Sequence, residues 1–300
     1  MRIFFVAVFD EENKSTNNSQ ARGFEALGHK VFRYSFRDRA LKIGDENRDF
    51  EIRGKLEEEK PDLVVFSKCA EISEDTIKFI CERYKTCYWY MDPLTSLRED
   101  YLVKSSYCSY VVTAVENTVP VFKKVNKNTF LVYEGFDGTI DKPIDTEKQF
   151  DVSFIGSLHS SRKEMLMNLN PNIINITGAY GVDHARAVSA SKININVSTS
   201  GGASDRIFKV LAAGGFLLTS EWIGREKLFE DGKHLVVFKD KNDLQQKINY
   251  YLSNKNERDE IAKNGNKKVQ QYNRDEWAKQ IIDISQGDLE QWNRTLMLQS

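Results

Sequence analysis

The chain is poor in cysteine and has neither a large net charge nor a long apolar run. Its 300 residues include four cysteines, and none of them has CxxC or metal-ligand spacing: Cys69, Cys81, Cys87 and Cys108. Such thiols are usually buried and reduced, so we expect no disulfide framework and no metal site. No apolar segment is long enough to span a membrane. The amino-terminal MRIFFVAVFDEE has acids where a signal peptide would be cleaved. These absences favour a soluble cytoplasmic protein.

The balanced charge and the missing catalytic motifs exclude further classes. The chain has 43 basic and 44 acidic residues and a formal net charge of -1, so no global field attracts nucleic acid or a membrane. A P-loop, an HExxH motif and a convincing Ser/His/Asp order are all missing, which leaves little support for a kinase, a metalloprotease or a hydrolase. Hydrophobic residues make up 40%, enough for packed cores, and the length suits two domains of about 150 residues each.

The first half of the chain alternates strand and helix patterns. Expected strands cover residues 3–9, 30–36, 63–67, 86–91, 110–114 and 129–133, and expected helices cover 17–27, 50–59 and 74–84. Strands separated by helices predict right-handed crossovers and a parallel sheet. The polar stretch 137–149 has glycine and proline breaks and is interpreted as an interdomain linker.

The second half repeats this alternation. Expected strands cover residues 152–155, 173–177, 193–197, 216–219 and 235–238, and expected helices cover 162–169, 183–190, 206–213, 242–252, 257–272 and 275–284. We therefore predict an α/β protein with two Rossmann-like parallel-sheet domains, 1–140 and 150–284, and a tail at 285–300. Ligands of such sheets bind at the carboxyl ends of the strands, so two facing domains would form a binding cleft.

The most informative stretch is RIFKVLAAGGFLLT at residues 206–219, which predicts a short helix, a double-glycine stop and a buried strand. A loop of small residues precedes it and leads into the amino terminus of the helix. Exposed backbone N–H groups and the positive end of the helix dipole suit a phosphate. The loop residues expected to donate are Gly201, Gly202 and Ser204, and Arg206 lies where the loop enters the helix.

Four segments together resemble a known family. They are FIGSLHSSRKEML at 154–166, SKININVS at 191–198, the stretch at 206–219, and LFEDGKHLVVFKDKNDLQQKINYYLSNKNERDEIAKNG at 228–265. Their order and spacing resemble the second domain of group-1, retaining, GT-B fold glycosyltransferases, in the branch of the spore-maturation-protein-type enzymes. The resemblance implies a nucleotide-diphosphate sugar as donor, held by the second domain, and an acceptor held by the first. It also implies retention of configuration, no required metal ion, and domain closure that excludes water.

One departure from the family concerns two glutamates that many group-1 enzymes carry with seven residues between them. Gly201 and Lys209 stand at these positions. A lysine cannot accept the hydrogen bonds that a carboxylate takes from a ribose diol. If the protein is an active enzyme, we expect Lys209 to contact phosphate or sugar oxygens of the donor instead.

The resemblance also assigns roles to residues around the expected cleft. It makes Arg162, near the turn at Gly156 and Ser157, a diphosphate-binding cation like Arg206, and we favour this role for both. The structural alternatives are a solvated charge pair on a surface helix for Arg162 and an ion pair with Asp205 or Glu221 for Arg206. Two further candidates also have structural alternatives. Gly178 and Tyr180 follow a strand of the second domain and either border a nucleotide base or form a plain turn, and the loop pattern favours the turn. Asp92 either orients a sugar as a catalytic residue or ends its strand before a proline, and the two interpretations have equal weight.

The acceptor and two other functions remain open in the sequence. Acceptor contacts are expected in the first domain near Asp10, Asn13, Asn18 and Asp92, and the acceptor is a glycan, a protein or a small molecule. A catalytically degenerate relative that binds a nucleotide or glycan would explain Gly201 and Lys209. A DNA-base-modifying glycosyltransferase shares the architecture, and a basic cluster at 123–127 would serve it, although the balanced charge argues against a DNA footprint.

Overall fold

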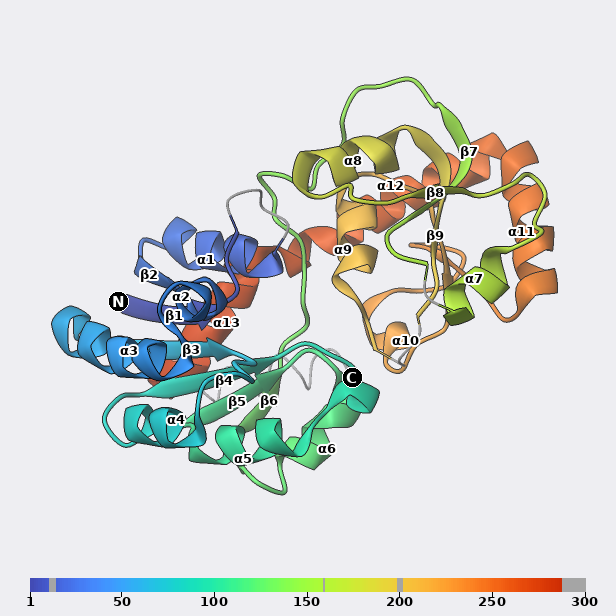
Figure 1. Cartoon of the computed structure of the whole chain (residues 1–300). Helices are drawn as coiled ribbons and strands as arrows, with labels where there is room; N and C mark the ends of the chain where they lie inside the picture. Colours follow the sequence, from blue (N-terminus) through green and yellow to red (C-terminus); the bar gives the residue numbers. More distant parts are fainter. Residues whose placement is uncertain (11–14, 159, 199–201, 288–300) are drawn as a thin grey trace. The chain divides into compact units, whose positions relative to one another are not determined.

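The computed structural model describes residues 1–10, 15–158, 160–198 and 202–287. The chain forms two compact units (Figure 1). The first comprises Met1–Tyr133 and the chain from Arg274 onward, and the second comprises Glu134–Asn273. The predicted class is confirmed, because each unit is an α/β structure built on a parallel sheet.

The first unit contains a six-stranded sheet in the order β2-β1-β3-β4-β5-β6. Its strands are β1 (Arg2–Ala7), β2 (Lys30–Ser35), β3 (Leu63–Ser67), β4 (Thr86–Tyr90), β5 (Tyr110–Thr113) and β6 (Thr129–Leu131). The central strands β3 and β4 are buried along their whole length. Helices cover both of their faces, which explains why their sequences are continuous apolar runs.

Two helices from opposite ends of the chain cover one face of this sheet. They are α1 (Thr16–Ala26) and α13 (Arg274–Gln286), and they pack together (Figure 1). Trp277 of α13 packs against Phe24 and Trp89 with ring centres 5.3 and 5.2 Å apart. The structure thus differs from the predicted boundaries at 140 and 284: the last helix belongs to the first unit because its apolar face completes that core.

The other face is covered by α3 (Asp45–Glu59), α4 (Glu74–Cys81), α5 (Glu99–Tyr107) and α6 (Val119–Phe122), while α2 (Phe36–Ile43) lies between β2 and α3 in the chain. The sequence pattern predicts neither α2 nor α5. Both are short and carry several charged residues, so their apolar periodicity is weak. Phe36, predicted as the end of a strand, instead begins α2 and is buried.

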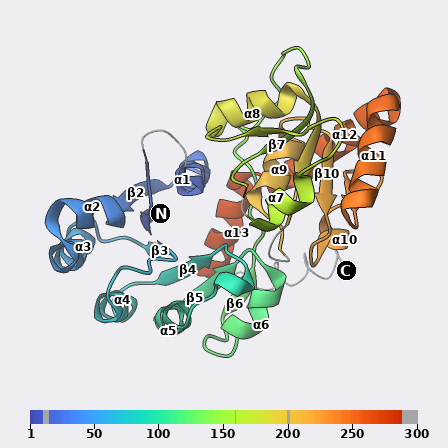
Figure 2. The same ribbon diagram turned by 45° about the vertical axis from the view of Figure 1, so that its right-hand side comes forward.

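The second unit contains a five-stranded sheet in the order β11-β10-β9-β7-β8. Its strands are β7 (Phe150–Ile155), β8 (Ile174–Ile176), β9 (Ser191–Asn196), β10 (Leu217–Ser220) and β11 (Val236–Phe238). Its helices are α7 (Ser160–Leu166), α8 (Gly181–Ser189), α9 (Asp205–Ala212), α10 (Arg225–Leu228), α11 (Lys241–Ser253) and α12 (Lys255–Val269), as seen from a second direction in Figure 2. The predicted linker at 137–149 lies within this unit, where Asp137 and Asp141 are buried.

Each sheet has one point at which the chain reverses the direction in which it adds strands. In the first unit the chain passes from β1 to β2 on one side and then returns to β3 on the other side of β1. In the second unit it passes from β7 to β8 and then returns to β9 on the other side of β7. Ligands of open parallel sheets bind outside the carboxyl ends of the strands at such points. The fold therefore marks β1/β3 and β7/β9 as the two places to examine.

Candidate functional site

The β7/β9 switch point is occupied by the guanidinium of Arg206. This residue is the second of α9, and its Nη1 donates a hydrogen bond of 3.1 Å to Oδ1 of Asn196 at the end of β9. Its guanidinium carbon lies 4.9 Å from the ring centre of Phe154 in β7. Burial, and secondarily the nearby charge of Arg162, lower the pKa of Arg206 to about 10. The side chain remains charged at neutral pH and is held by a neutral partner.

Asn196 fixes this guanidinium through a short buried chain of hydrogen bonds. Its side chain is buried, and its Nδ2 donates to Oγ1 of Thr219 in β10 at 3.0 Å. The Thr219 hydroxyl in turn donates to the carbonyl oxygen of Ser220 at 2.9 Å. Because the amide nitrogen of Asn196 is committed to Thr219, its oxygen is turned toward Arg206.

Gly156 makes room for the arginine at the end of β7. Its φ is +136°, and a Cβ atom at this position would lie 2.6 Å from Nη2 of Arg206. A side chain here would be strained and would displace the guanidinium. The predicted turn thus acts at this point by admitting Arg206 rather than by supplying a side chain.

Arg162 approaches the same aromatic ring from α7. Its Nε donates to the carbonyl oxygen of Val197 at 3.3 Å and its Nη1 to that of Ser157 at 3.4 Å. Its guanidinium carbon lies 5.8 Å from the centre of the Phe154 ring, and burial lowers its pKa. In the part of the chain that the structure describes, neither arginine forms an ion pair. Two partly buried positive charges therefore lie at the carboxyl ends of neighbouring strands without an ion-pair partner among the described residues, an arrangement suited to a polyanion.

The two acids considered as partners of Arg206 have other partners. Asp205 pairs with Lys209 at 2.7 Å, one turn along α9, and Glu221 pairs with Arg225 at 2.8 Å. The charge of Lys209 is thus compensated within its own helix. Its predicted contact with the donor stays a prediction.

Four other predicted ligands follow strands of the same sheet: Gly202 and Ser204 lie between β9 and α9, and Gly178 and Tyr180 lie between β8 and the start of α8. Ser204 is the N-cap of α9, although its side chain makes no capping hydrogen bond, and the carbonyl oxygen of Gly202 accepts from Ser198 at 3.4 Å. Gly201 lies outside the described residues. Gly178 has a φ of +72°, and Tyr180 precedes α8 with 48% of its surface exposed. Their roles at the phosphates and at the base stay predictions.

Asp92 belongs to the first unit, where it follows β4 and pairs with Lys68 at 2.7 Å. Lys68 lines a pocket of about 280 Å³ at the β1/β3 switch point. Of the predicted acceptor contacts, Asp10 accepts from the Ser15 amide at 2.5 Å and Asn18 donates to the Asp10 carbonyl at 2.7 Å, next to this pocket. Asn13 lies outside the described residues.

Sequence reasoning missed Phe154 and Asn196 as parts of the site. A signal was available for Asn196, because SKININVS places asparagines in alternation with isoleucines in the buried part of the strand. A polar side chain in such a strand needs a buried partner. Nothing in the sequence indicates that Arg206 is that partner. The two residues are ten positions apart, on a strand and on the helix that follows it, and they come into contact only in the folded unit.

His184 of α8 gives the second unit a measurable pH dependence. It is buried, its Nδ1 has no hydrogen-bond partner among the described residues, and desolvation, with Lys209 adding to it, lowers its pKa to about 3. The unfolded chain takes up this proton near pH 6.5, whereas the folded chain does not. The contribution of the neutral imidazole to the free energy of unfolding is therefore fully present above pH 6.5 and is lost as the pH falls toward 3. Between pH 7.5 and 5.5 the free energy of unfolding should fall by about 1 kcal/mol less for His184→Gln than for the wild type. Urea unfolding at the two pH values measures this; equal losses would contradict the buried neutral imidazole.

Comparisons with known proteins identify a domain family and a fold. Residues 141–283 match the family model described as "Glycosyl transferase-like". No match was found among curated proteins. Solved structures resemble the whole chain at low identity. The HepE protein of Anabaena in complex with UDP-glucose is 13% identical, covers 98% of this chain and 100% of its own, and has a TM-score of 0.69.

Two further structures are similar over nearly the whole length. Sucrose-phosphate synthase from Thermosynechococcus elongatus is 12% identical, with full coverage of both chains and a TM-score of 0.69. A glycosyltransferase from Rickettsia africae is 13% identical, covers 96% of this chain and 98% of its own, and has a TM-score of 0.68. Within the described ranges no helix has the length and apolarity needed to cross a membrane. Residues 141–283 thus contain a glycosyl transferase-like domain, and the chain as a whole has the same two-sheet GT-B fold as these solved structures.

Proposed function

We propose that this protein transfers a sugar from a nucleoside diphosphate donor to an acceptor hydroxyl, and that its second unit binds the donor diphosphate between Arg162 and Arg206. The observation that carries the proposal is the pair of guanidinium groups around Phe154 without a carboxylate partner in the described chain. Negative charge grows on the leaving diphosphate as the glycosidic bond breaks. Preorganised positive charge at that position lowers the barrier.

A uridine nucleotide is the first donor to test. HepE of Anabaena, which shares the fold, was solved with UDP-glucose. The family resemblance further supports retention of configuration at the transferred carbon and transfer without a resident metal ion. The anomeric configuration of the product, read by NMR, tests the first, and donor turnover in the presence of a chelator tests the second.

The four cysteines are free thiols in the structure. Free thiols suit a reducing compartment, which supports our proposal that the enzyme acts in the cytoplasm.

We expect a nucleoside diphosphate to stabilise the protein. A ligand that binds only the folded state adds about 2.7 kcal/mol at a hundredfold excess over its dissociation constant. Thermal unfolding with UDP, GDP, ADP and the corresponding nucleosides measures the effect, and the diphosphates should raise the melting temperature more than their nucleosides do. A flat response to every nucleotide and nucleotide sugar would contradict the donor assignment.

Turnover distinguishes an enzyme from a relative that only binds. Release of nucleoside diphosphate from a labelled donor sugar is expected of an active transferase, at least slowly with water as acceptor. Binding without any release, with every acceptor class offered, would favour the degenerate relative that Gly201 and Lys209 leave open.

A further inference from the structure

The first unit has a pocket at its own switch point. The pocket of about 280 Å³ lies outside the carboxyl ends of β1 and β3, between Val8, the start of α1 and the segment 67–71. Phe36, Met91 and Tyr101 give it apolar walls. Its volume is close to the lower end of the range for small-molecule sites, about 300 Å³.

The wall formed by residues 68–71 is held in an unusual conformation. Lys68 and Cys69 are consecutive non-glycine residues with left-handed backbone, at φ of 61° and 54°. Each such residue costs of order 1 kcal/mol and persists only where the surrounding structure enforces it. Contacts from the rest of the unit must therefore offset the conformational energy of this segment.

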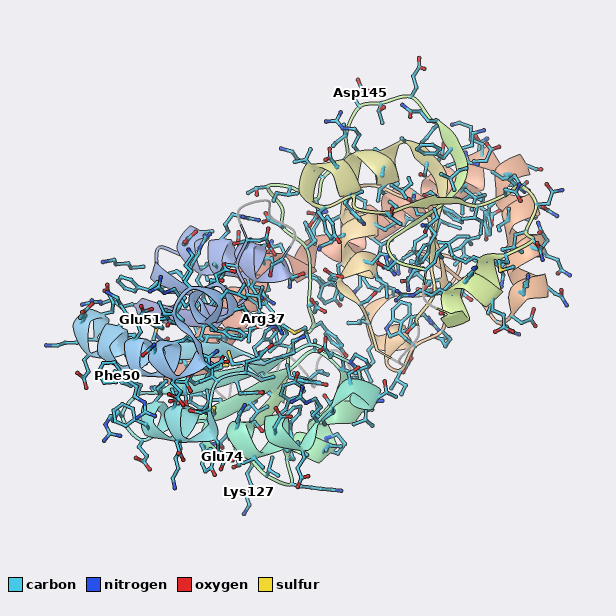
Figure 3. The ribbon with its side chains drawn as sticks, in the orientation of Figure 1. Arg37, Phe50, Glu51, Glu74, Lys127 and Asp145 are labelled. Atoms are coloured by element: carbon cyan, nitrogen blue, oxygen red, sulfur yellow. The ribbon has the colours of Figure 1, made fainter. Side chains whose placement is uncertain are left out.

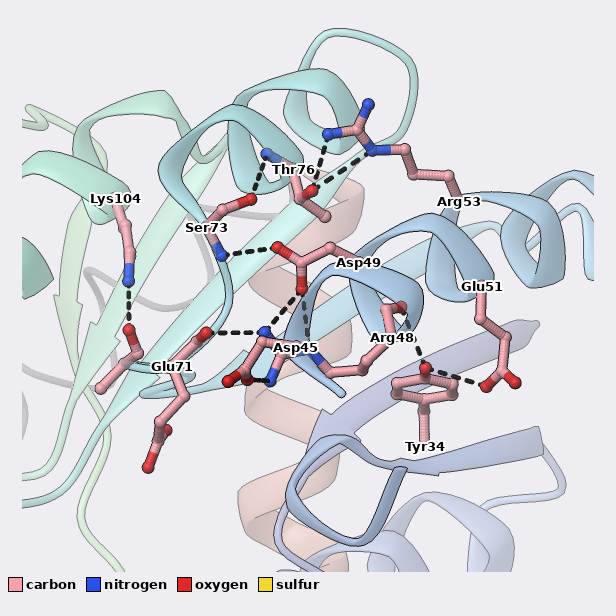
Figure 4. A network of polar contacts seen from close by, with 11 residues as sticks. Tyr34, Asp45, Arg48, Asp49, Glu51, Arg53, Glu71, Ser73, Thr76 and Lys104 are labelled. Atoms are coloured by element: carbon pink, nitrogen blue, oxygen red, sulfur yellow. Dashed lines mark hydrogen bonds and ion pairs between the residues drawn. The ribbon is translucent and has the colours of Figure 1, made fainter. Parts of the chain in front are cut away.

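Buried charges on neighbouring helices hold the residues that follow Cys69 in the chain (Figure 4). Arg48 of α3 is fully buried and donates to the backbone carbonyl of Glu71 at 2.7 Å. The buried ammonium of Lys104, whose pKa is lowered mainly by burial, donates to the carbonyl of Ala70. Asp49 accepts from the backbone amide of Ser73 at 2.9 Å and pairs with Arg48. Burial of a charged side chain costs desolvation free energy. Here the buried charges hold one loop in place, so the pocket wall is preformed.

The charges at the pocket are balanced in pairs. Arg37, which projects from α2 (Figure 3), pairs with Glu71 at 2.7 Å, and both residues line the pocket. Lys68 also lines it and pairs at 2.7 Å with Asp92, which follows the lining residue Met91 in the chain. An anionic ligand would meet a carboxylate beside each cation, and a cationic ligand would meet the reverse. A neutral hydroxyl can instead donate to the carboxylate and accept from the ammonium or guanidinium of the same pair.

We propose that this pocket binds the acceptor and that the acceptor is a neutral sugar. A sugar ring combines hydroxyls for the two ion pairs with an apolar C–H face for the walls at Phe36, Met91 and Tyr101. The assignment of the ligand as acceptor rests on the proposed transferase function. The chemistry of the ligand follows from the pocket itself.

Binding of simple glycosides to the whole protein tests the proposal. The probes are methyl glycosides of glucose, galactose, mannose and N-acetylglucosamine, with methyl glucuronide and glucose 6-phosphate as anionic counterparts, observed by saturation-transfer NMR. We expect at least one neutral glycoside to bind in preference to both anions. Lys68→Met should weaken it about tenfold, because one charged hydrogen bond is lost. Lys127→Met is the matched control, since Lys127 is exposed and remote from the pocket lining (Figure 3).

A second variant changes specificity instead of removing affinity. Glu71→Gln leaves Arg37 without its carboxylate, so methyl glucuronide should bind more tightly than it binds to the wild type. UDP affinity, measured on every variant, reports on folding and on the second unit separately. If UDP binds but no neutral glycoside does, or if Lys68→Met has no effect, or if the wild type prefers the anions, the pocket proposal is overturned while the donor site stands. Loss of UDP binding in the wild type would overturn the proposed function itself.

Discussion

Arg206→Ala should reduce release of nucleoside diphosphate from the donor by about a hundredfold to a thousandfold, because the variant loses a preorganised charge at the leaving group. The position of Arg206 at a helix start predicts a solvent-accessible side chain whose removal leaves the fold intact. The structure corrects this prediction, because Arg206 is partly buried and its removal leaves Oδ1 of Asn196 without its donor. We therefore also expect a loss of about 1–3 kcal/mol in the free energy of unfolding.

The controls separate catalysis from folding. Arg206→Lys keeps the charge but not the planar fork, and it should fall between the wild type and the alanine variant. Arg186→Ala removes an exposed arginine of α8 in the same unit and should leave both properties unchanged. Near-normal diphosphate release in a folded Arg206→Ala protein would assign Arg206 a structural role only.

Asn196→Asp should weaken binding of a nucleoside diphosphate by at least tenfold while it leaves nucleoside binding unchanged. The substitution is nearly isosteric, but it places a carboxylate 3.1 Å from the Arg206 guanidinium. The introduced carboxylate neutralises the charge of Arg206, which the diphosphate neutralises in the wild type. The diphosphate must therefore compete with this carboxylate for the guanidinium.

Titration calorimetry with UDP and uridine measures the two affinities on the same protein. The nucleoside serves as the internal control, because a general distortion of the site would weaken both ligands together. Unchanged affinity for the diphosphate would mean that Asn196 does not set the charge state of this site.

The sequence predicted the parts of the structure that depend on local pattern. The continuous apolar runs at β3 and β10 and the double glycine after α9 indicated strands and helices of parallel sheets, and the position of Arg206 at a helix start made it a candidate cation. The pairing of Arg206 with Asn196 and the slot at Gly156 depend on three chain segments that meet only in the folded unit. No local pattern encodes such a meeting.

The first-unit pocket was even less accessible from sequence. The segment 67–71 contains no glycine, so nothing indicated a left-handed backbone at Lys68 and Cys69. Arg48, Asp49 and Lys104 belong to charged helical stretches that resemble solvated surface. Asp92 was identified as a candidate, but its ion pair with Lys68 was not predicted. The pair joins the ends of two neighbouring strands, so it depends on the order of strands in the sheet, which no local pattern gives.

The measurement that tests the central claim most directly compares UDP with uridine on the wild type and on Arg206→Ala by titration calorimetry. If Arg162 and Arg206 hold a diphosphate, UDP should bind the wild type at least a hundredfold more tightly than uridine, since each charged hydrogen bond to the phosphates adds about 1.5–3 kcal/mol. That difference should shrink at least tenfold in the variant. Equal affinities of the wild type for UDP and uridine, with GDP and ADP no better than their nucleosides, would contradict the account.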